Sequence, residues 1–451
     1  MITSSSAAIN PNDLPVAIVG AGPVGLAAAV HAVQRGLTPI IFERGPAVGA
    51  SLRAWAHVRM FSPWRFNIDP AARALLTATG WRAPDEDDLP TGGDVVRDYL
   101  QPLATHPAIA PHLRLNAEVL AISRVGRDKL TSAGRKQAPF AIRWRGSDGE
   151  ERNQLARAVV DASGVWFSPN PMGADGLRVP GEAAAADRIA YGVPDVLSAA
   201  RDAYAGAATL VVGSGHSAMN VILDLLTLKE QTGGGQVQWA LRRNRIARLL
   251  GGGLNDQLPA RGALGAAAVA AIRDGRLQLL SPYAAERIDR IDGGLRVVGR
   301  LDGQAHETDV QRVVVATGLR PDLSILRELR VALDPVMEAP PALAPLIDPN
   351  VHSCGTVPPH GVVELAHPEA GFYIVGGKSY GRAPTFLMAT GYEQARSVMA
   401  EIAGDHAAAR EVRLVLPETG VCGADFSSDD APPPAPDRTG AKAAGCCGKS
   451  A

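Results

Sequence analysis

The chain has 451 residues, and its 45 basic and 46 acidic side chains nearly cancel. This balance excludes a protein that holds nucleic acid or an anionic membrane through its overall charge. At ~150 residues per domain, the length predicts two or three domains. The N-terminal residues lack the basic and apolar regions of a secretory signal, and the longest small-apolar run, 263–272, is too short to span a bilayer. We therefore expect a soluble cytoplasmic protein without nucleic-acid or membrane partners.

Residues 16–44 have the pattern of a strand, a glycine turn, a helix and a second strand. A short apolar run at 16–19 predicts a buried parallel strand, and G-x-G-x-x-G spacing follows it directly. In such a turn the first glycine permits the bend, the second admits a pyrophosphate and the third lets the helix pack closely. A helix to Gln34, a strand at 39–42 and an acid 23 residues after the first glycine complete the unit. The residues expected to contact a first nucleotide are Gly20, Gly22, Pro23, Gly25, Glu43 and Arg44.

Residues 45–69 are dense in tryptophan, arginine, phenylalanine and histidine. Aromatic and guanidinium faces can cover a planar cofactor. For this role we select Trp55, Arg65 and Asn67, and Asn67 is the candidate catalytic residue. The alternative is a capping loop in which Trp55 and Trp64 fill a local core.

The following residues predict connecting structure. Thr91 to Leu103 has the pattern of an amphipathic helix, and short alternating runs between Leu113 and Val160 predict an antiparallel meander. A buried strand then returns at 158–161, and a similar one occurs at 313–316. Each of these two strands ends in a turn of small residues, from which we select Gly164, Thr317 and Gly318 as cofactor contacts.

A second nucleotide unit lies between these two turns. It has an apolar strand at 209–212, a glycine turn, a helix and a further strand at 237–241. That strand is followed by arginines rather than an acid, and guanidinium groups there suit the 2′-phosphate of NADPH. A solvated basic turn is the alternative. The residues expected to contact the second nucleotide are Gly213, Ser214, Gly215, His216, Ser217, Ala218, Arg242 and Arg243.

After the second unit the chain resumes the first. Residues 371–377 predict one more apolar strand with a glycine turn, and a helix is expected from Thr385 to Ile402. Gly376 and Lys378 are expected to contact the first cofactor. The tail beyond Val421 is rich in Pro, Ser, Asp and Ala, a composition that is typical of disorder.

Taken together, the two glycine turns and the small-residue turns at 161–164 and 316–318 resemble the flavoproteins with two dinucleotide-binding domains. The resemblance implies an α/β fold with two Rossmann-like domains of three-layer ββα type, the NADPH domain inserted into the FAD domain. It also implies FAD on the first turn and NADPH on the second. The expected ranges are 1–13 for a flexible N-terminus, 14–185 and 312–415 for the FAD domain, 186–311 for the NADPH domain, and 416–451 for a disordered cysteine-containing tail.

Within this superfamily the chain looks most like the flavin-containing monooxygenases. The turn from Gly213 to Ala218 is similar to the second-nucleotide turn of that branch, and Trp55 and Asn67 resemble its FAD-side Trp and Asn. The identity sequence of true monooxygenases is not recognisable between Val179 and Tyr191. Gly376-Gly377-Lys378 replaces the Gly-Asp pair of many disulfide reductases, and no C-x-x-C or C-x-x-x-x-C motif is present. The missing pair argues against a reductase with a dithiol beside the flavin.

Three of the four cysteines lie near the C-terminus. The adjacent pair Cys446-Cys447 is similar to the terminal pair of mercuric reductases, and Cys422 could supply a third sulfur ligand for a soft metal or metalloid. The whole pattern, including residues 350–360, also resembles a group of flavoproteins associated with metalloid resistance. A disordered tail with incidental cysteines is the alternative reading.

The resemblance implies an FAD- and NADPH-dependent oxidoreductase. We expect a monooxygenase in which a peroxyflavin oxidises a soft nucleophilic atom of a small substrate with O₂. One alternative is a reductase that acts on a metal or metalloid delivered by the C-terminal cysteines, and another is a flavin- or metalloid-binding sensor with little turnover. The sequence is compatible with a homodimer.

Overall fold

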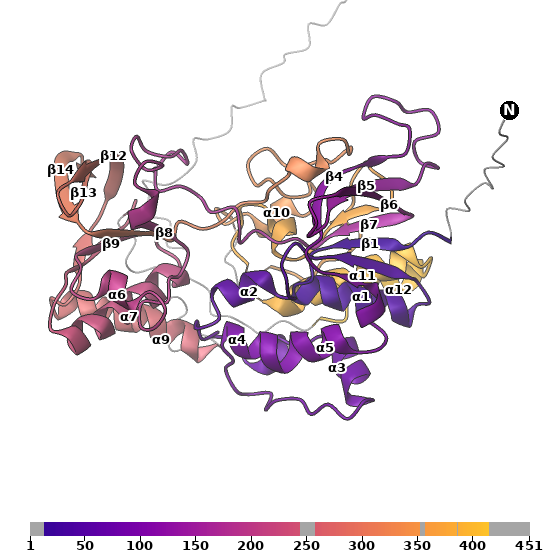
Figure 1. Cartoon of the computed structure of the whole chain (residues 1–451), viewed down its shortest axis with the longest axis horizontal. Helices are drawn as coiled ribbons and strands as arrows, with labels where there is room; N and C mark the ends of the chain where they lie inside the picture. The colour runs from indigo at the N-terminus through magenta and orange to yellow at the C-terminus, as the bar shows by residue number, and fades with distance from the viewer. Residues whose placement is uncertain (1–12, 244–257, 352–356, 386, 415–451) are drawn as a thin grey trace, which may run out of the picture.

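A computed structural model describes residues 13–243, 258–351, 357–385 and 387–414. These residues form two α/β units that lie side by side (Figure 1). The first unit is built on a five-stranded parallel sheet. Its strands, in spatial order, are β16 (Phe372–Ile374), β7 (Ala158–Asp161), β1 (Val16–Val19), β2 (Pro39–Phe42) and β3 (Leu113–Arg114).

The second unit is built on another five-stranded parallel sheet. Its strands, in spatial order, are β11 (Gln278–Leu280), β10 (Val237–Ala240), β9 (Thr209–Val212), β15 (Arg312–Val315) and β8 (Ile189–Tyr191). All five lie between β7 and β16 in the sequence. The second sheet is therefore formed by a segment inserted into the chain that forms the first.

Each parallel sheet is covered by a small antiparallel sheet on one face. The first unit carries β4 (Glu118–Arg124), β5 (Phe140–Arg145) and β6 (Glu151–Ala156). The second carries β12 (Tyr283–Ile291), β13 (Gly294–Leu301) and β14 (Gln304–Val310). The meander predicted from residue 113 onward is confirmed for β4 to β6. Its first two residues are an exception, because they pair with β2 in parallel as β3.

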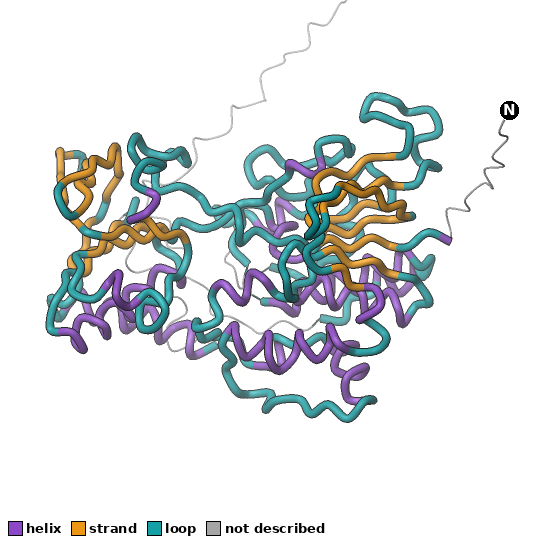
Figure 2. The backbone as a smooth tube through the Cα atoms, in the orientation of Figure 1, coloured by secondary structure: helices purple, strands orange, loops and turns teal. Residues whose placement is uncertain are grey.

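Helices cover the opposite face of each sheet, as Figure 2 shows. The main ones are α1 (Pro23–Gln34) and α11 (Met388–Ile402) in the first unit, and α7 (His216–Thr232) and α9 (Pro259–Arg273) in the second. The shorter ones are α2 (Ala50–Ala54), α3 (Pro70–Thr77), α4 (Gly92–Val95), α5 (Gln101–Thr105), α6 (Arg201–Tyr204), α10 (Ala344–Ile347) and α12 (His406–Arg410). The predicted helix from residue 91 is confirmed. Thr91 caps α4, and a π-helical turn at Val96–Leu100 joins α4 to α5.

The alternation of side chains along β1 explains the three layers. Val16 and Ile18 belong to the core shared with α1 and α11, whereas Ala17 and Val19 belong to the core shared with β4 and β5. A strand buried on both faces must be apolar throughout, which is why the run is continuous. The sheet of the second unit is likewise divided between two cores, so both units have the predicted ββα layering. No helix of the described residues is long and apolar enough to cross a membrane.

Candidate cofactor-binding site

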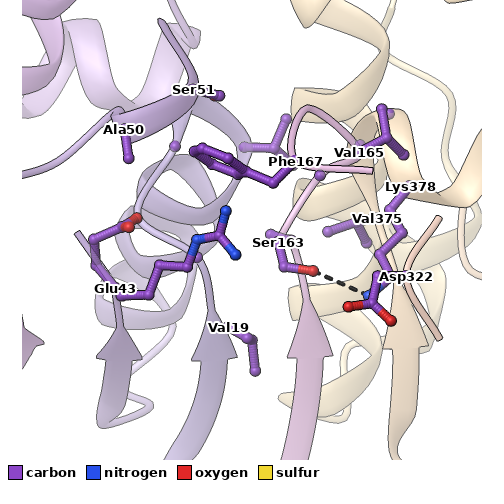
Figure 3. Close-up of a pocket in the computed structure, with 18 of the residues that line it drawn as sticks. Val19, Glu43, Ala50, Ser51, Ser163, Val165, Phe167, Asp322, Val375 and Lys378 are labelled. Carbon is purple, nitrogen blue, oxygen red and sulfur yellow. Dashed lines mark hydrogen bonds between the residues drawn. The ribbon is translucent and has the colours of Figure 1, made fainter. Parts of the chain in front are cut away.

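A cavity of about 470 Å³ opens at the carboxyl ends of the strands of the first sheet (Figure 3). Its walls come from the turns after β1 and β7, the end of β2, the 3-10 helix at Gly376–Tyr380 and the beginning of α11. Loops beyond the carboxyl ends of parallel strands are where open α/β sheets bind ligands. Eight of the predicted first-site residues line it: Gly20, Gly22, Pro23, Glu43, Arg44, Gly164, Gly376 and Lys378.

The three glycines of the first turn have different structural roles. Gly20 has φ +100°, and a Cβ there would lie 2.7 Å from the carbonyl oxygen of Ala162 in the turn after β7. A Cβ on Gly25 would lie 1.9 Å from the carbonyl oxygen of Gly20, so both positions exclude a side chain. Gly22 is different, because a Cβ there would meet nothing within 4 Å. The space in front of Gly22 belongs to the cavity.

Gly22 also marks the beginning of α1. It is the N-cap residue of the helix, and no side chain caps the helix N-terminus. The N–H groups of the first turn and the helix dipole therefore face a cavity in which a pyrophosphate would satisfy them. Open space and an uncapped helix meet at the same residue.

Glu43 and Arg44 shape the β2 side of the cavity. The buried Glu43 carboxylate accepts hydrogen bonds from the N–H groups of Ala21, at 2.9 Å, and Gly45, at 2.8 Å. The Arg44 guanidinium lies 3.6 Å from the ring centroid of Phe167, within cation–π range. Phe167 also lines the cavity and is labelled in Figure 3. Glu43 therefore links the first glycine turn to the end of β2, where a ribose is bound in dinucleotide folds.

A buried ion pair lies at the other side of the cavity. Lys378 Nζ donates to Asp161 Oδ2 at 2.7 Å and to Ser163 Oγ at 3.0 Å, and the two charged side chains are 2% and 0% exposed. Asp161 Oδ1 accepts hydrogen bonds from the N–H and the hydroxyl of Ser163. These bonds fix the turn after β7, in which Gly164 has φ +70°. Lys378 and Ser163 line the cavity, and Asp161 supports them from behind.

The second glycine turn repeats the geometry of the first. Gly213 has φ +133°, and a Cβ there would lie 2.2 Å from the carbonyl oxygen of Ala316 in the turn after β15. Gly215 is the N-cap of α7, which no side chain caps, and a Cβ on it would meet nothing within 4 Å. Ala218, at the third position, is fully buried. The indole N–H of Trp239, in β10, donates to the carbonyl of Gly213 at 2.7 Å and holds the turn in place.

The remaining residues predicted for the second site surround this turn. Ser214 and Ser217 are exposed, and the ring of His216 lies 5.0 Å from that of Phe61 in the first unit. Arg242 and Arg243 are exposed after β10, where Arg242 Nη1 donates to the carbonyl of Ala174 at 2.9 Å. Both guanidinium groups are therefore accessible at the strand end where a 2′-phosphate would be bound.

Thr317 and Gly318 lie where the chain crosses between the units, and they do not line the cavity of the first. The Asn170 N–H donates to the Gly318 carbonyl at 2.9 Å, and the Arg320 N–H donates to the Ser168 carbonyl at 3.0 Å. The hydroxyl of Thr317 donates to the Asn170 carbonyl at 2.9 Å. The two connections between the units, residues 168–170 and 318–320, therefore run antiparallel and are hydrogen-bonded to each other.

Trp55, Arg65 and Asn67, which were expected near the cofactor, do not line the cavity either. Asn67 is fully buried, and its side-chain amide donates to the carbonyls of Ser62 and Pro63. Asn67 thus holds its own loop. Arg65 is exposed and pairs with Asp87.

The tryptophans follow the alternative that the sequence left open. Trp64 is buried in the core of the first unit, and Trp55 packs partly against that core with its ring 6.3 Å from that of Trp166. Of residues 45–69, those that line the cavity are Ala50, Ser51 and Leu52. The aromatic segment therefore packs beside the site without covering it.

All four cysteines, including the predicted metal ligands Cys422, Cys446 and Cys447, lie outside the described residues. Within the described ranges no group of three or more His, Cys, Asp or Glu side chains could hold a metal ion.

Four residues of the site were not predicted from the sequence. Ser163, Phe167 and Asp322 line the cavity, and Phe61 contacts the second turn. Ser163 belongs to the small-residue turn 161–164, and this position is a signal that could have selected it. Phe167, Asp322 and Phe61 lie in irregular segments, where neither periodicity nor motif spacing applies.

Two glycine turns of this geometry, on two parallel sheets with the second inserted into the first, define the fold of the two-domain FAD- and NAD(P)-linked oxidoreductases. Residues 17–136 match the family model described as pyridine nucleotide-disulphide oxidoreductase. No curated protein sequence matches the chain significantly.

Solved structures confirm the fold over most of the chain. Bacillithiol disulfide reductase from Bacillus cereus is 18% identical, with a TM-score of 0.63 over 87% of this chain and 99% of that one. FAD-bound cadaverine monooxygenase from Erwinia amylovora is 14% identical, with a TM-score of 0.61 over 89% and 97%. Ornithine N-hydroxylase from Kutzneria sp. 744, solved with reduced FAD, NADP⁺ and L-ornithine, is 17% identical, with a TM-score of 0.57 over 87% and 98%. The fold prediction is confirmed, and proteins with this fold include both reductases and monooxygenases.

Proposed function

We propose that the protein is an FAD-dependent oxidoreductase that takes electrons from NADPH and oxidises a small substrate with O₂. The observation that carries the proposal is the repeated turn. Gly22 and Gly215 each face open space at an uncapped helix N-terminus. At Gly20 and Gly213, by contrast, the backbone of the turn after the neighbouring strand leaves no room for a side chain. Two such turns on two sheets fit two dinucleotides.

The first site fits FAD. Gly22 and the first turn of α1 would bind the pyrophosphate, and the Glu43 carboxylate is placed for the hydroxyls of the adenosine ribose. Ser163 and Lys378 offer polar groups on the far side of the cavity. When bound, FAD supplies the two-electron chemistry, and the residues of the chain bind and orient it.

The second site fits NADPH. Gly215 and the first turn of α7 would bind its pyrophosphate, and the exposed Arg242 and Arg243 would bind the 2′-phosphate. The contact of Phe61 with His216 places a segment of the first unit against this turn. Residues of both units would therefore meet the bound nucleotide.

Two features favour oxygenation of a small substrate over dithiol-based disulfide reduction. The sequence contains no C-x-x-C or C-x-x-x-x-C pair, and no cysteine occurs among the described residues that line the cavity. Two of the structural neighbours are by their titles a cadaverine monooxygenase and an ornithine N-hydroxylase. We infer that the substrate is a small molecule with a soft nucleophilic atom.

The test is anaerobic and aerobic stopped-flow of the FAD-reconstituted protein. We expect NADPH to bleach the flavin under anaerobic conditions, and O₂ to restore the oxidised spectrum through an oxygen-dependent transient. If NADPH does not reduce the flavin, the proposal of an NADPH-dependent oxidoreductase is refuted. Reoxidation without a transient, together with substrate-dependent NADPH consumption in the absence of O₂, would instead support a reductase.

A second candidate function is favoured by the adjacent cysteines near the C-terminus. We propose as the alternative that Cys446 and Cys447, with Cys422, bind a soft metal or metalloid and deliver it to the flavin for reduction. Deleting residues 421–451 would then abolish tight arsenite binding while FAD content stays unchanged. Equal arsenite affinity in the full-length and truncated proteins would exclude this role.

A further inference from the structure

We propose that Lys378, held in place by Asp161, raises the reduction potential of the bound flavin. The inference rests on the proposed binding of FAD. It starts from a buried charge pair that the binding of adenosine and pyrophosphate does not require.

The order of strands places Lys378 beside the flavin half of the cofactor. Glu43 at the end of β2 fits the adenosine ribose, and Gly22 after β1 fits the pyrophosphate. In the sheet, β7 and β16 lie on the opposite side of β1 from β2. A dinucleotide bound in this direction extends its other half over β7 and β16. Lys378 follows β16, and its Nζ is bonded to Asp161 at the end of β7.

The pair presents its positive end to the cavity. Lys378 lines the cavity (Figure 3). Asp161 does not, although the charged atoms of the two residues are only 2.7 Å apart. Among the described residues that line the cavity, Lys378 is the one buried cation, because Arg44 is exposed. Asp322, an acid of the same lining, is also exposed. A buried charge is screened far less than an exposed one. The buried acid of the lining, Glu43, lies on the β2 side, so beside β7 and β16 Lys378 is the buried charge that faces the cavity among the described residues.

The hydrogen bonds of Lys378 leave capacity for a ligand. Within the described residues its ammonium donates to Asp161 and Ser163, which uses two of its three hydrogens. One N–H therefore remains for an acceptor bound in the cavity. Asp161 in turn accepts two hydrogen bonds from Ser163, which hold its carboxylate in place.

This arrangement has a defined consequence for electron transfer. Hydride from NADPH carries two electrons and one proton, so it leaves the flavin with one more negative charge and releases NADP⁺. A fixed positive charge beside the flavin stabilises the product over the reactant and tunes the cofactor electronically. Lys378 would therefore raise the reduction potential, and Asp161 would restrain that effect by partly neutralising the ammonium.

The experiment measures the two-electron midpoint potential of FAD bound to the full-length protein. In the Lys378→Met/Asp161→Asn double variant the charge pair is absent, and the introduced asparagine side chain keeps the oxygen that Ser163 needs. We use the double variant because Lys378→Met alone would leave a buried carboxylate unpaired. We expect the equilibrium constant for reduction of the bound FAD to fall tenfold or more. For a two-electron couple each tenfold corresponds to a shift of the midpoint potential by about 30 mV in the negative direction.

Three further variants make the result specific. Lys378→Arg keeps the charge and should restore most of the potential. Asp161→Asn alone keeps the ammonium without its partner and should shift the potential in the positive direction. Lys136→Met is the matched control, since Lys136 is exposed and does not line the cavity.

An unchanged potential in the FAD-loaded double variant would overturn the inference while leaving the proposed function intact. Failure of the wild-type protein to bind FAD would instead overturn the proposed function. The two failures are therefore distinguishable.

Discussion

The geometry of the first turn predicts different effects when two of its glycines are replaced by alanine. Gly22→Ala adds a methyl group to open space at a residue with φ −80°, so the protein without cofactor should fold normally. Gly25→Ala adds the same methyl group 1.9 Å from the carbonyl oxygen of Gly20. The first change should damage binding, and the second should damage the fold.

The magnitudes follow from these contacts. At Gly22 the loss of N-cap preference and the lower entropy of the unfolded chain oppose each other, which keeps the change in unfolding free energy within about 1 kcal/mol. At Gly25 the helix must move away from β1, and overpacking of this kind costs about 1–3 kcal/mol. Displacing the pyrophosphate from the helix N–H groups should cost about 1.5–3 kcal/mol, or roughly ten- to a hundredfold in the Kd for FAD.

The assay combines thermal unfolding of the FAD-free protein with titration of FAD. The second turn supplies a matched pair, because Gly215→Ala enters open space and Gly213→Ala meets the Ala316 carbonyl at 2.2 Å. Gly215→Ala should weaken NADPH binding and leave FAD binding unchanged. Normal FAD affinity in Gly22→Ala, or equal loss of stability in Gly22→Ala and Gly25→Ala, would refute the assignment of the first turn.

Three further predictions concern charged residues. Arg242→Glu should raise the KM for NADPH about ten- to a hundredfold more than that for NADH, and equal changes would show that Arg242 does not bind the 2′-phosphate. Burial, followed by repulsion from Asp195, raises the pKa of Asp224 to about 6, so its ionisation destabilises the fold as pH rises toward 6. Asp224→Asn should therefore raise the melting temperature at pH 7.5 and leave it unchanged near pH 4, which thermal scans at the two pH values will check. Burial alone would raise the pKa of Glu369, but hydrogen bonds from Arg135, the Arg330 N–H and Arg124 lower it below 4.5. The stability from this cluster is present above pH 4.5 and is lost as pH falls through the lowered pKa. Glu369→Gln should cost about 3–5 kcal/mol at pH 7 in denaturant unfolding, and a loss below 1 kcal/mol would contradict the role of the cluster.

The sequence predicted those parts of the molecule in which spacing determines geometry. β1, β2 and the three glycines have a fixed separation, because a tight turn and a close helix contact allow few other residues. The structure accordingly places β1 and β2 at the expected residues. The apolar runs at 158–161 and 313–315 were equally informative, because strands buried on both faces must be apolar throughout.

The site residues outside these motifs could not be predicted in the same way. Asn67 resembled a cofactor contact, but its amide is used by the carbonyls of its own loop, a role that depends on the loop conformation. The partner of Lys378 is Asp161, more than 200 residues earlier in the chain, and only the adjacency of β7 and β16 brings them together. Long-range pairing of this kind leaves no local pattern in the sequence.

The insertion of one sheet into the other has a consequence for synthesis on the ribosome. β7 lies between β1 and β16, so the first sheet lacks its last strand until residues 372–374 have been made. The second sheet is complete once β15 has emerged, which happens several seconds earlier at about 5–20 residues per second. During this interval one edge of β7 remains open while the second unit can already fold. The unit that begins the chain is thus the last to be finished, and its exposed strand edge is where association between nascent chains would begin.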